Sequence, residues 1–459
     1  MIASTMSQPA AMRRFFDSGS TRSYQFRKEQ LQKLKRVILE HEEGIYEALH
    51  QDLKKSREES WVTEVGFVVA EINHAIRRLR QWMAPERAGT NLVNFPSSSR
   101  VLREPKGVVL IIGPWNYPFM LLMDPLVGAI AAGNCAVVKP SEQASATEKI
   151  IQQILERSFS SEYVRCITGD GSVVVPELLS QHAFDHLFFT GSTSVGRKVY
   201  QQAAEKLIPV TLELGGKSPV IVERDANINV AAKRITITKF SNAGQMCVAP
   251  EYVLVHEDVK DKLVQAIQET IPRFFSQEPE ESYNYCRIIN AAQFDRLTRY
   301  LQNGKIIYGG RSDRDRLYIE PTILDAVSPE DPVMNEEIFG PILPVLTFRT
   351  REEAAAIVKR HPYPLAFYLF TSNRRSEQKW LEEIPFGGGC INNASWHLTN
   401  YHLPFGGRNF SGIGHYHGKY SFDTFSHLKG IMRTPTWFDP AIKYPPFQGK
   451  LRLFRWIIR

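Results

Sequence analysis

The sequence predicts an α/β protein with two lobes, the first of them built on a doubly wound parallel sheet. Short apolar runs alternate with helix-length stretches in two successive parts of the chain, and connections of that length join parallel strands. A length of 459 residues leaves room for two or three domains with sizeable cores. With 43% hydrophobic and 23% charged residues, the composition is typical of a globular protein and excludes disorder along the whole chain.

The N-terminal region is expected to be helical. Between Tyr24 and Trp82 apolar residues recur at helix spacing, for example Leu31, Leu34 and Ile38. This periodicity predicts two or three amphipathic helices. The following stretch, from Ala84 to Arg103, is rich in Pro, Ser and Asn and resembles neither lobe, so we expect an excursion or arm.

The first lobe follows this stretch, and the second begins near Lys217 with the apolar run SPVIV. In the first lobe we expect strands at 108–112, 136–138, 164–167, 186–189 and 209–212, and helices at 120–132, 147–157 and 195–206. In the second lobe we expect strands at 252–255, 342–348 and 366–371, and helices at 228–240 and 259–271.

The net charge of +7 is concentrated at the C-terminus. Residues 429–459 hold seven basic residues and one acidic residue, which leaves +1 for the other 428 residues. A nearly neutral body gives little reason to expect a nucleic-acid surface, because duplex binding needs basic side chains over many phosphates. On a helix, Arg452, Arg455 and Arg459 share one face and Leu451, Phe454, Ile457 and Ile458 lie largely on another, with Trp456 at the boundary.

This basic amphipathic segment is too short to span a bilayer but suited to lying on one. An equally weighted alternative is that the segment packs against a partner subunit. The chain has no run of about twenty apolar residues, and its first residues lack the pattern of a secretory signal. Five scattered cysteines, with no Cys-x-x-Cys pair, predict a reducing compartment and hence a cytoplasmic location.

Two residues stand out as candidate catalytic groups. Cys247 lies in FSNAGQMCVAPEYV, on a Gly-containing loop that could present a nucleophile. Cys135, Cys166 and Cys390 are better explained as small buried residues, and Cys286 has no motif that points to a function. Glu213 interrupts the apolar run VTLELGG, where a carboxylate is costly unless it is hydrogen-bonded, exposed or functional. From this segment alone, catalytic base and structural acid at a strand end are equally good explanations.

Three further segments follow predicted strands. FTGSTSVG opens a predicted helix, where free backbone N–H groups favour an anion. In VVKPSE, Lys139 and Glu142 could bind a ribose, although a plain turn that caps a helix is the alternative. Asn116 in GPWNYP could donate to a developing oxyanion, and its alternative role is turn formation.

Together these strings resemble the aldehyde dehydrogenase superfamily, from about Arg14 to His427. The matching pieces, in the family's order, are GPWNYP, VVKPSE, FTGSTSVG, VTLELGGKSP, GQMC, NEEIFGP and PFGG. The short N-terminus, GQMCVAPEYV and the ending SFDTFSH are most similar to the dimeric class 3 and fatty aldehyde dehydrogenase branch. One departure is RNFSGIG after Pro404-Phe405-Gly406-Gly407, where Asn409 and Phe410 replace a Gly and a small or polar residue.

The resemblance implies a Rossmann-like cofactor domain, an α/β catalytic domain and a small β oligomerisation arm in a homodimer. The implied bounds are 1–86 and 106–212 for the NAD(P)-binding domain, 213–422 for the catalytic domain, 87–105 and 423–436 for the arm, and 437–459 for the tail. The implied reaction is the oxidation of medium- or long-chain or aromatic aldehydes to carboxylic acids through a cysteine thiohemiacetal and thioester. The alternatives are a coenzyme A-acylating relative and a non-catalytic, membrane-associated scaffold.

The resemblance also assigns site residues. Cys247 matches the nucleophile, Glu213 the general base and Asn116 the oxyanion donor, and Tyr117 and Trp396 are candidates for the aldehyde channel. The implied cofactor contacts are Trp115, Lys139, Glu142, Gly191, Ser192, Gly196, Glu337 and Phe339. The carboxylate of Glu142 favours NAD because it repels a 2′-phosphate, with NADP as the alternative. No metal is expected, since His415 and His417 lack a third ligand.

Overall fold

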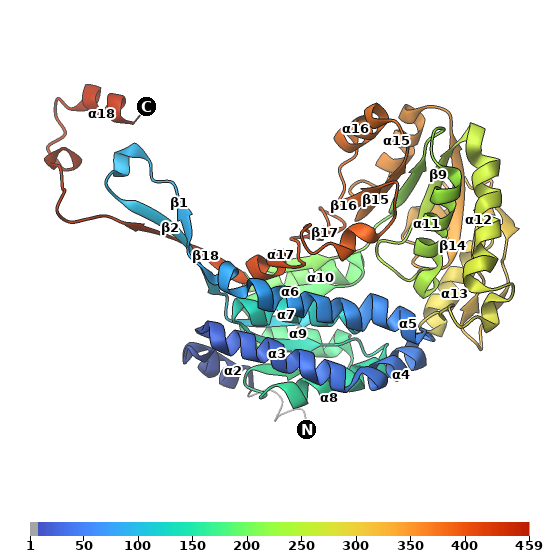
Figure 1. Cartoon of the computed structure of the whole chain (residues 1–459), viewed down its shortest axis with the longest axis horizontal. Helices are drawn as coiled ribbons and strands as arrows, with labels where there is room; N and C mark the ends of the chain where they lie inside the picture. The colour runs from blue at the N-terminus through green and yellow to red at the C-terminus, as the bar shows by residue number, and fades with distance from the viewer. Residues whose placement is uncertain (1–7, 459) are drawn as a thin grey trace.

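The computed structural model describes residues 8–458. Two α/β lobes form the body, and a narrow arm of antiparallel strands projects from it, with the C-terminal segment running along the arm's far end (Figure 1). The two predicted sheets are therefore present, and they lie side by side rather than as one continuous sheet.

Helices of the N-terminal region pack against the first lobe. They are α2 (Gln8–Asp17), α3 (Tyr24–Glu40), α4 (Glu42–Leu53), the short α5 (Arg57–Ser60) and α6 (Gly66–Met83), with a π-helical turn at Trp61–Val65. The Ser23 side chain accepts a hydrogen bond from Phe26 N and begins α3, while Leu31, Leu34 and Ile38 are fully buried. The predicted amphipathic helices are confirmed.

The first lobe holds a six-stranded sheet in the order β17-β7-β6-β3-β4-β5. Its strands are β3 (Val108–Ile112), β4 (Cys135–Lys139), β5 (Val164–Cys166), β6 (His186–Thr190), β7 (Val210–Glu213) and β17 (Gly412–Ile413), and its helices are α7 (Met120–Ala132), α8 (Ser145–Ser158), α9 (Gly171–Gln181) and α10 (Thr193–Glu205). All strand pairs are parallel except β17 with β7. The chain winds outward from β3 in both directions, so the carboxyl ends of β3 and β6 border the crevice at which such sheets bind ligands.

The predicted strands and helices of this lobe are confirmed, but α9 was not predicted. Its sequence GSVVVPELLSQ combines three β-branched residues with an internal proline, a pattern that disfavours a helix locally. Asp170 nevertheless begins the helix by accepting from Ser172 N, and Val175, Leu178 and Leu179 are buried against the lobe. Burial of one face therefore outweighs the weak local preference.

The second lobe holds a seven-stranded sheet in the order β10-β13-β14-β9-β8-β15-β16. Its strands are β8 (Pro219–Val222), β9 (Tyr252–His256), β10 (Lys305–Tyr308), β13 (Thr322–Asp325), β14 (Ile342–Phe348), β15 (Ala366–Phe370) and β16 (Gly388–Ile391), with a separate pair formed by β11 (Ser312–Asp313) and β12 (Tyr318–Ile319). Its helices are α11 (Ile228–Phe240), α12 (Lys260–Phe275), α13 (Ala291–Tyr300), α14 (Pro332–Asn335), α15 (Arg351–Lys359) and α16 (Arg374–Glu383). The predicted elements of this lobe are confirmed.

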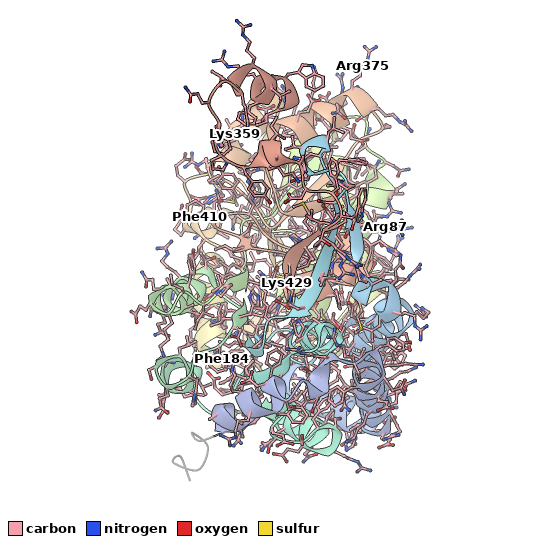
Figure 2. All side chains as sticks on the ribbon, turned by 90° about the vertical axis from the view of Figure 1, so that its left-hand side faces the viewer. Arg87, Phe184, Lys359, Arg375, Phe410 and Lys429 are labelled. Carbon is pink, nitrogen blue, oxygen red and sulfur yellow. The ribbon has the colours of Figure 1, made fainter. Side chains whose placement is uncertain are left out.

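The arm consists of β1 (Glu86–Ala88), β2 (Ser98–Pro105) and β18 (Ser426–Arg433), all antiparallel. Figure 2 looks onto this side of the molecule and labels Arg87 and Lys429 on its strands. Between the second lobe and β18, the chain returns to the first lobe. There β17 pairs with β7, and α17 (Lys419–Thr424) packs on α7. The domain bounds given above remain predictions, and β17 is a strand of the range 213–422 that joins the first sheet.

The tail beyond the arm ends in a short helix, α18 (Leu451–Ile457). Leu451, Trp456 and Ile458 are 61%, 76% and 70% exposed, and the Phe447 and Phe454 rings pack edge to face at 5.7 Å. Arg459, which we placed on the basic face, lies outside the described residues, as do the first seven residues of the range 1–86. Among the helices of residues 8–458, none combines the length and apolar character needed to cross a bilayer.

Candidate active site

One cavity of about 1000 Å³ collects most of the candidate residues at the carboxyl ends of the strands of the first lobe. Its walls come from both lobes, with Trp115, Lys139 and Glu213 on one side and Cys247 and Phe339 on the other. Of the residues assigned by resemblance, those that line this cavity are Trp115, Asn116, Lys139, Glu142, Gly191, Ser192, Glu213, Cys247, Glu337 and Phe339. The fold therefore brings together residues separated by more than two hundred positions.

Cys247 is partly accessible, at the start of a tight turn between α11 and β9. The turn is closed by a hydrogen bond from Ala249 N to Met246 O (2.9 Å), and the Tyr368 hydroxyl of β15 donates to Val248 O (2.6 Å). Burial raises the pKa of the Cys247 thiol, and the nearby carboxylates Glu337 and Glu213 raise it further. Hydrogen bonds from the backbone N–H groups of Cys247 and Val248 act in the opposite direction and favour the thiolate.

Glu213 ends β7 and faces the same cavity. The residue is 3% exposed, and neither carboxylate oxygen has a hydrogen-bond partner among the described residues. Burial without a partner raises the pKa of this carboxyl group well above its ordinary value. A carboxyl group in this state is poised to take up a proton, so the structure favours the functional explanation of Glu213 over that of a hydrogen-bonded structural acid.

Asn116 lies in the turn between β3 and α7 and is 3% exposed. Its side-chain nitrogen donates to the backbone oxygen of Gln245 at 3.1 Å, two residues before Cys247. An amide nitrogen carries two hydrogens, so one remains for another acceptor in the cavity. This arrangement places a neutral donor in the cavity that Cys247 also lines.

Glu337 and Phe339 reach the cavity from the loop before β14. Burial raises the pKa of Glu337 to about 8, with Glu251 adding to the rise, while the Gly216 N–H and Lys217 lower it. The Phe339 ring meets the Trp115 ring edge to face at 5.2 Å. The loop packs so closely that a β-carbon on Gly215 would lie 1.9 Å from the Glu337 carboxylate.

Two charged residues that the sequence analysis did not select hold this loop. Lys217 donates to the backbone oxygens of Val333 (2.6 Å) and Glu336 (2.7 Å), and Glu251 accepts from the backbone N–H groups of Ile338 and Phe339. A signal was present in the sequence, because both residues interrupt apolar stretches in the same way as Glu213.

The other end of the cavity has the chemistry of a dinucleotide site. Lys139 ends β4 and donates to Glu142 at 2.6 Å, and Ser192 begins α10 by accepting from Val195 N. The N-terminus of α10 borders the cavity, so its free N–H groups and dipole favour a phosphate. Gly196 does not line the cavity in this structure; a β-carbon there would lie 2.5 Å from Leu214, so the glycine lets α10 pack closely on the sheet. These residues fit a nicotinamide dinucleotide.

The two candidate channel residues lie outside the lining of the cavity. Tyr117 is 5% exposed, its ring lies under the Lys55 ammonium at 4.1 Å, and its hydroxyl lies 3.6 Å from Met246 Sδ. Trp396 begins a 3₁₀ turn at Trp396–Thr399 and is 60% exposed. Phe405 and Tyr416, which the sequence analysis missed, also line the cavity and face each other across a β-bridge.

The segment that departs from the family pattern forms a tight loop. Asn409 has a left-handed backbone (φ 56°), which asparagine tolerates better than most residues and which glycine adopts freely. Phe410 is 57% exposed and lies on the side of the molecule shown in Figure 2. Asparagine can therefore replace the usual glycine without a change of loop conformation.

His417 is buried between aromatic rings rather than exposed as a ligand. Its ring lies 5.2 Å from that of Phe405 and 5.6 Å from that of Phe67, and burial lowers its pKa to about 3. Within residues 8–458, no three His, Cys, Asp or Glu side chains are grouped as metal ligands. The expectation of no metal stays a prediction.

Comparison with known proteins decides the family. The family model described as "Aldehyde dehydrogenase family" matches residues 7–431. The chain belongs to the aldehyde dehydrogenase family. Its similarity to family 3 members extends over nearly the whole chain, so the predicted family and its class 3 branch are confirmed.

Three relatives illustrate the similarity of this aldehyde dehydrogenase. The 4,4′-diaponeurosporen-aldehyde dehydrogenase of Staphylococcus aureus is 46% identical over 96% of each chain, and aldehyde dehydrogenase family 3 member H1 of Arabidopsis thaliana is 43% identical, covering 97% of this chain and 93% of the relative. A solved structure of Staphylococcus aureus AldH in a substrate-bound state has a TM-score of 0.95 at 45% identity, covering 98% of each chain. The predicted fold class is thereby confirmed.

Proposed function

We propose that this aldehyde dehydrogenase oxidises apolar aldehydes to carboxylic acids with NAD⁺ or NADP⁺, using Cys247 as nucleophile, Glu213 as general base and Asn116 as oxyanion donor. One observation carries the proposal: a partly accessible thiol, an unpaired buried carboxyl group and a side-chain amide meet in one cavity whose far end suits a dinucleotide. Each of these groups matches one chemical requirement of the reaction.

The cofactor would be held along the cavity from α10 to the Glu337 loop. The pyrophosphate suits the N-terminus of α10, Lys139 and Glu142 suit the adenosine ribose, and Glu337 and Phe339 suit the nicotinamide ribose and ring. Because Glu142 presents a carboxylate, NAD is proposed ahead of NADP. When bound, the cofactor supplies the hydride acceptor for the oxidation.

In the first half of the reaction, the Cys247 thiolate adds to the aldehyde carbon. Because burial raises the thiol pKa in the unliganded site, the thiol proton must leave as attack proceeds, and the backbone N–H groups of Cys247 and Val248 favour the thiolate that forms. The free amide hydrogen of Asn116 and the Cys247 backbone N–H donate to the oxyanion that forms. Such preorganised donors are worth about 10²- to 10³-fold each in rate.

In the second half, the acyl group remains on Cys247 as a thioester. Glu213 takes a proton from water as the water attacks the thioester carbon, which releases the carboxylic acid and restores the thiol. A general base contributes about 10²- to 10⁴-fold to such a step. The raised pKa of Glu213 makes it a stronger base than an exposed carboxylate.

The substrate class is proposed from the aromatic lining and from one relative. Phe405, Tyr416 and Leu121 line the same cavity as Cys247, and the Staphylococcus aureus relative is named for an aldehyde of 4,4′-diaponeurosporene. We therefore propose medium- and long-chain aliphatic aldehydes and aromatic aldehydes as substrates. A channel role for Tyr117 and Trp396 is part of the proposal, with Trp396 at the exposed end.

The assembly proposed is a homodimer bridged by the arm, in the cytoplasm. Unpaired main-chain groups along the edges of β1 and β18 and exposed apolar residues such as Leu92 (85%) and Phe95 (64%) suit contact with a second subunit. The five cysteines are all free, which fits a reducing compartment. Peripheral membrane contact through the tail is proposed beside partner-subunit packing as its alternative.

The deciding experiment is NADH formation by purified protein with a chain-length series of aldehydes. We expect specificity constants that rise with chain length, and no dependence on coenzyme A, because Glu213 provides for hydrolysis of the thioester. Dependence on coenzyme A would indicate the acylating alternative. Absence of NADH and NADPH formation across aliphatic and aromatic aldehydes would indicate a non-catalytic scaffold. Light scattering of the wild-type protein and of a variant altered in the arm would report the oligomeric state and whether the arm determines it.

A further inference from the structure

Asn242 occupies an unusual place in the loop before Cys247. It is fully buried, and its backbone is left-handed (φ 50°, ψ 29°), followed by left-handed Ala243 and Gly244. Three such residues in succession turn the chain sharply from α11 toward the cavity. Asparagine tolerates this conformation, but so does glycine, so the backbone alone does not explain why an amide side chain stands here.

The amide nitrogen of Asn242 joins two distant main-chain segments. It donates to the backbone oxygen of Asn116 at 2.8 Å and to the backbone oxygen of Gln245 at 3.1 Å. Both of its hydrogens are thereby used. The side-chain oxygen, in contrast, has no partner among the described residues, so the donor half of the amide makes all of its recorded contacts.

The Gln245 carbonyl is the point at which the two amides meet. Its oxygen accepts from the side chains of both Asn116 and Asn242, each at 3.1 Å, which fills its two lone-pair directions. Because a carbonyl only accepts, it admits the nitrogen and not the oxygen of the Asn116 amide. The orientation of that amide is therefore set by the position of one backbone oxygen.

Other contacts hold the same carbonyl in place. The Gln245 side chain donates to the backbone oxygens of Asn242 (3.0 Å) and Arg287 (2.9 Å) and accepts from Ile289 N (3.0 Å). The Glu59 carboxylate of α5 accepts from Asn242 N at 2.9 Å. Asn242 thus lies at the centre of a buried network that connects α5, the turn carrying Asn116 and the loop carrying Cys247.

We propose that Asn242 is a positioning residue for the oxyanion donor: by bridging Asn116 O and Gln245 O, it keeps the Asn116 amide nitrogen aimed at the position of the developing negative charge. This inference rests on the proposed function, since it takes Asn116 as that donor. Loss of the bridge leaves two buried carbonyl oxygens short of a donor and frees the turn of Asn116 to shift. A displacement of about 1 Å in a reacting constellation can cost about 10²-fold in rate.

Two substitutions separate hydrogen-bond polarity from shape. Asn242→Gly keeps the left-handed backbone and removes the amide, whereas Asn242→Asp keeps the shape and places an acceptor oxygen against two carbonyl oxygens. We expect both to slow the first-turnover burst of NADH by about 10- to 100-fold. The affinity for NAD⁺ without aldehyde should stay within about two-fold, because Asn242 makes no contact in the dinucleotide part of the cavity.

The decisive measurement is a double-mutant cycle with Asn116→Ala. If Asn242 acts through Asn116, the double variant Asn116→Ala with Asn242→Gly bursts as slowly as Asn116→Ala alone, within about two-fold. Multiplicative losses, a wild-type burst in Asn242→Gly, or an Asn242→Asp enzyme close to wild type would each overturn the inference. A normal burst in Asn116→Ala would instead overturn the oxyanion assignment, and the inference with it.

Asn392 offers a matched control for the backbone and for stability. It is also left-handed (φ 57°), and its amide exchanges hydrogen bonds with the main chain of Thr371, donating to the oxygen (2.8 Å) and accepting from the nitrogen (3.0 Å). We expect both Asn392→Gly and Asn242→Gly to lower the melting temperature. Asn392→Gly should nevertheless leave the burst rate within about two-fold of wild type. An equal loss of burst rate in both variants would mean that the effect of Asn242 is merely structural.

Discussion

The ammonium group of Lys217 lies 3.2 Å from the carboxylate of Glu251, and both side chains are at most 2% exposed. Neither residue lines the cavity. Together they bind four main-chain groups of the loop that carries Glu337 and Phe339. The pair therefore connects the end of the second sheet to the cofactor side of the cavity.

Replacing Glu251 by Gln leaves Lys217 as a buried charge without its counter-charge. Breaking a buried pair in this way costs about 3–5 kcal/mol. With an unfolding entropy of about 2.1 cal/mol/K per residue, this corresponds to a fall of about 3–5 °C in the melting temperature of a chain of this size. The KM for NAD⁺ should rise as well, because the loop loses a charged acceptor for two of its N–H groups.

The exposed pair of Arg349 and Glu257 serves as the control for Glu251. Its side chains are 77% and 43% exposed, and such pairs contribute about 0–1 kcal/mol. Glu257→Gln should shift the melting temperature by less than about 1 °C. Equal shifts for the two variants would contradict a specific role of the buried pair.

Cys247→Ser should abolish turnover, since a hydroxyl is a far weaker nucleophile at this position. Glu213→Gln should retain a burst of about one NADH per subunit and then slow by about 10²- to 10⁴-fold, because only the hydrolysis of the thioester lacks its base. Rapid-mixing absorbance at 340 nm, followed by steady-state assay, distinguishes the two phases. Unchanged steady-state turnover in Glu213→Gln would show that another group is the base.

The pKa of Glu337, raised to about 8 by burial and by Glu251, predicts a pH dependence of cofactor binding. The ionised carboxylate accepts from ribose hydroxyls, whereas the protonated form gives up part of that capacity. Affinity for NAD⁺ should therefore rise as pH increases through about 8. Fluorescence titration between pH 6 and 9 measures this, and Glu337→Gln should flatten the profile. A profile that stays steep in the variant would assign the titration to another group.

The buried His417 predicts a loss of stability in mild acid. Its folded-state pKa is lowered to about 3 by burial and by His397, whereas an unfolded histidine titrates near about 6.5. The unfolded state therefore binds more protons below about pH 6.5, so the contribution is complete above that pH and is lost as pH falls toward 3. Melting temperatures at pH 7 and pH 5 should differ less in His417→Gln than in wild type. An identical difference would remove His417 from the acid response.

Truncation after Gly449 tests the tail. It removes α18 with its exposed Leu451, Trp456 and Ile458 and the basic residues Arg452 and Arg455. Each basic group near an anionic surface contributes about 1 kcal/mol. The truncated protein should therefore no longer sediment with vesicles rich in phosphatidylserine, and sedimentation of the full chain should weaken with added salt. If vesicle binding is unchanged while the oligomeric state shifts, the tail packs against a partner subunit instead.

Much of the fold follows from local pattern. β3, β4 and β6 are apolar runs bounded by turn residues, and α3 and α6 have one apolar face, so each is visible within a short window of sequence. The element α9 escaped because its valines and proline oppose a helix locally. Which strands become neighbours depends on contacts between distant segments, and hence on the folded chain.

The sequence by itself determined the kinds of chemical group at the site. Cys247, Glu213 and Asn116 were candidates from their local segments, and the resemblance to the family assigned the role of each. Only the tertiary structure decided the environments of these groups: the unpaired burial of Glu213, the Lys217–Glu251 support and the bridge from Asn242 to a residue 126 positions away. Burial and hydrogen bonding depend on atoms supplied by remote segments, and no spacing within one segment encodes them.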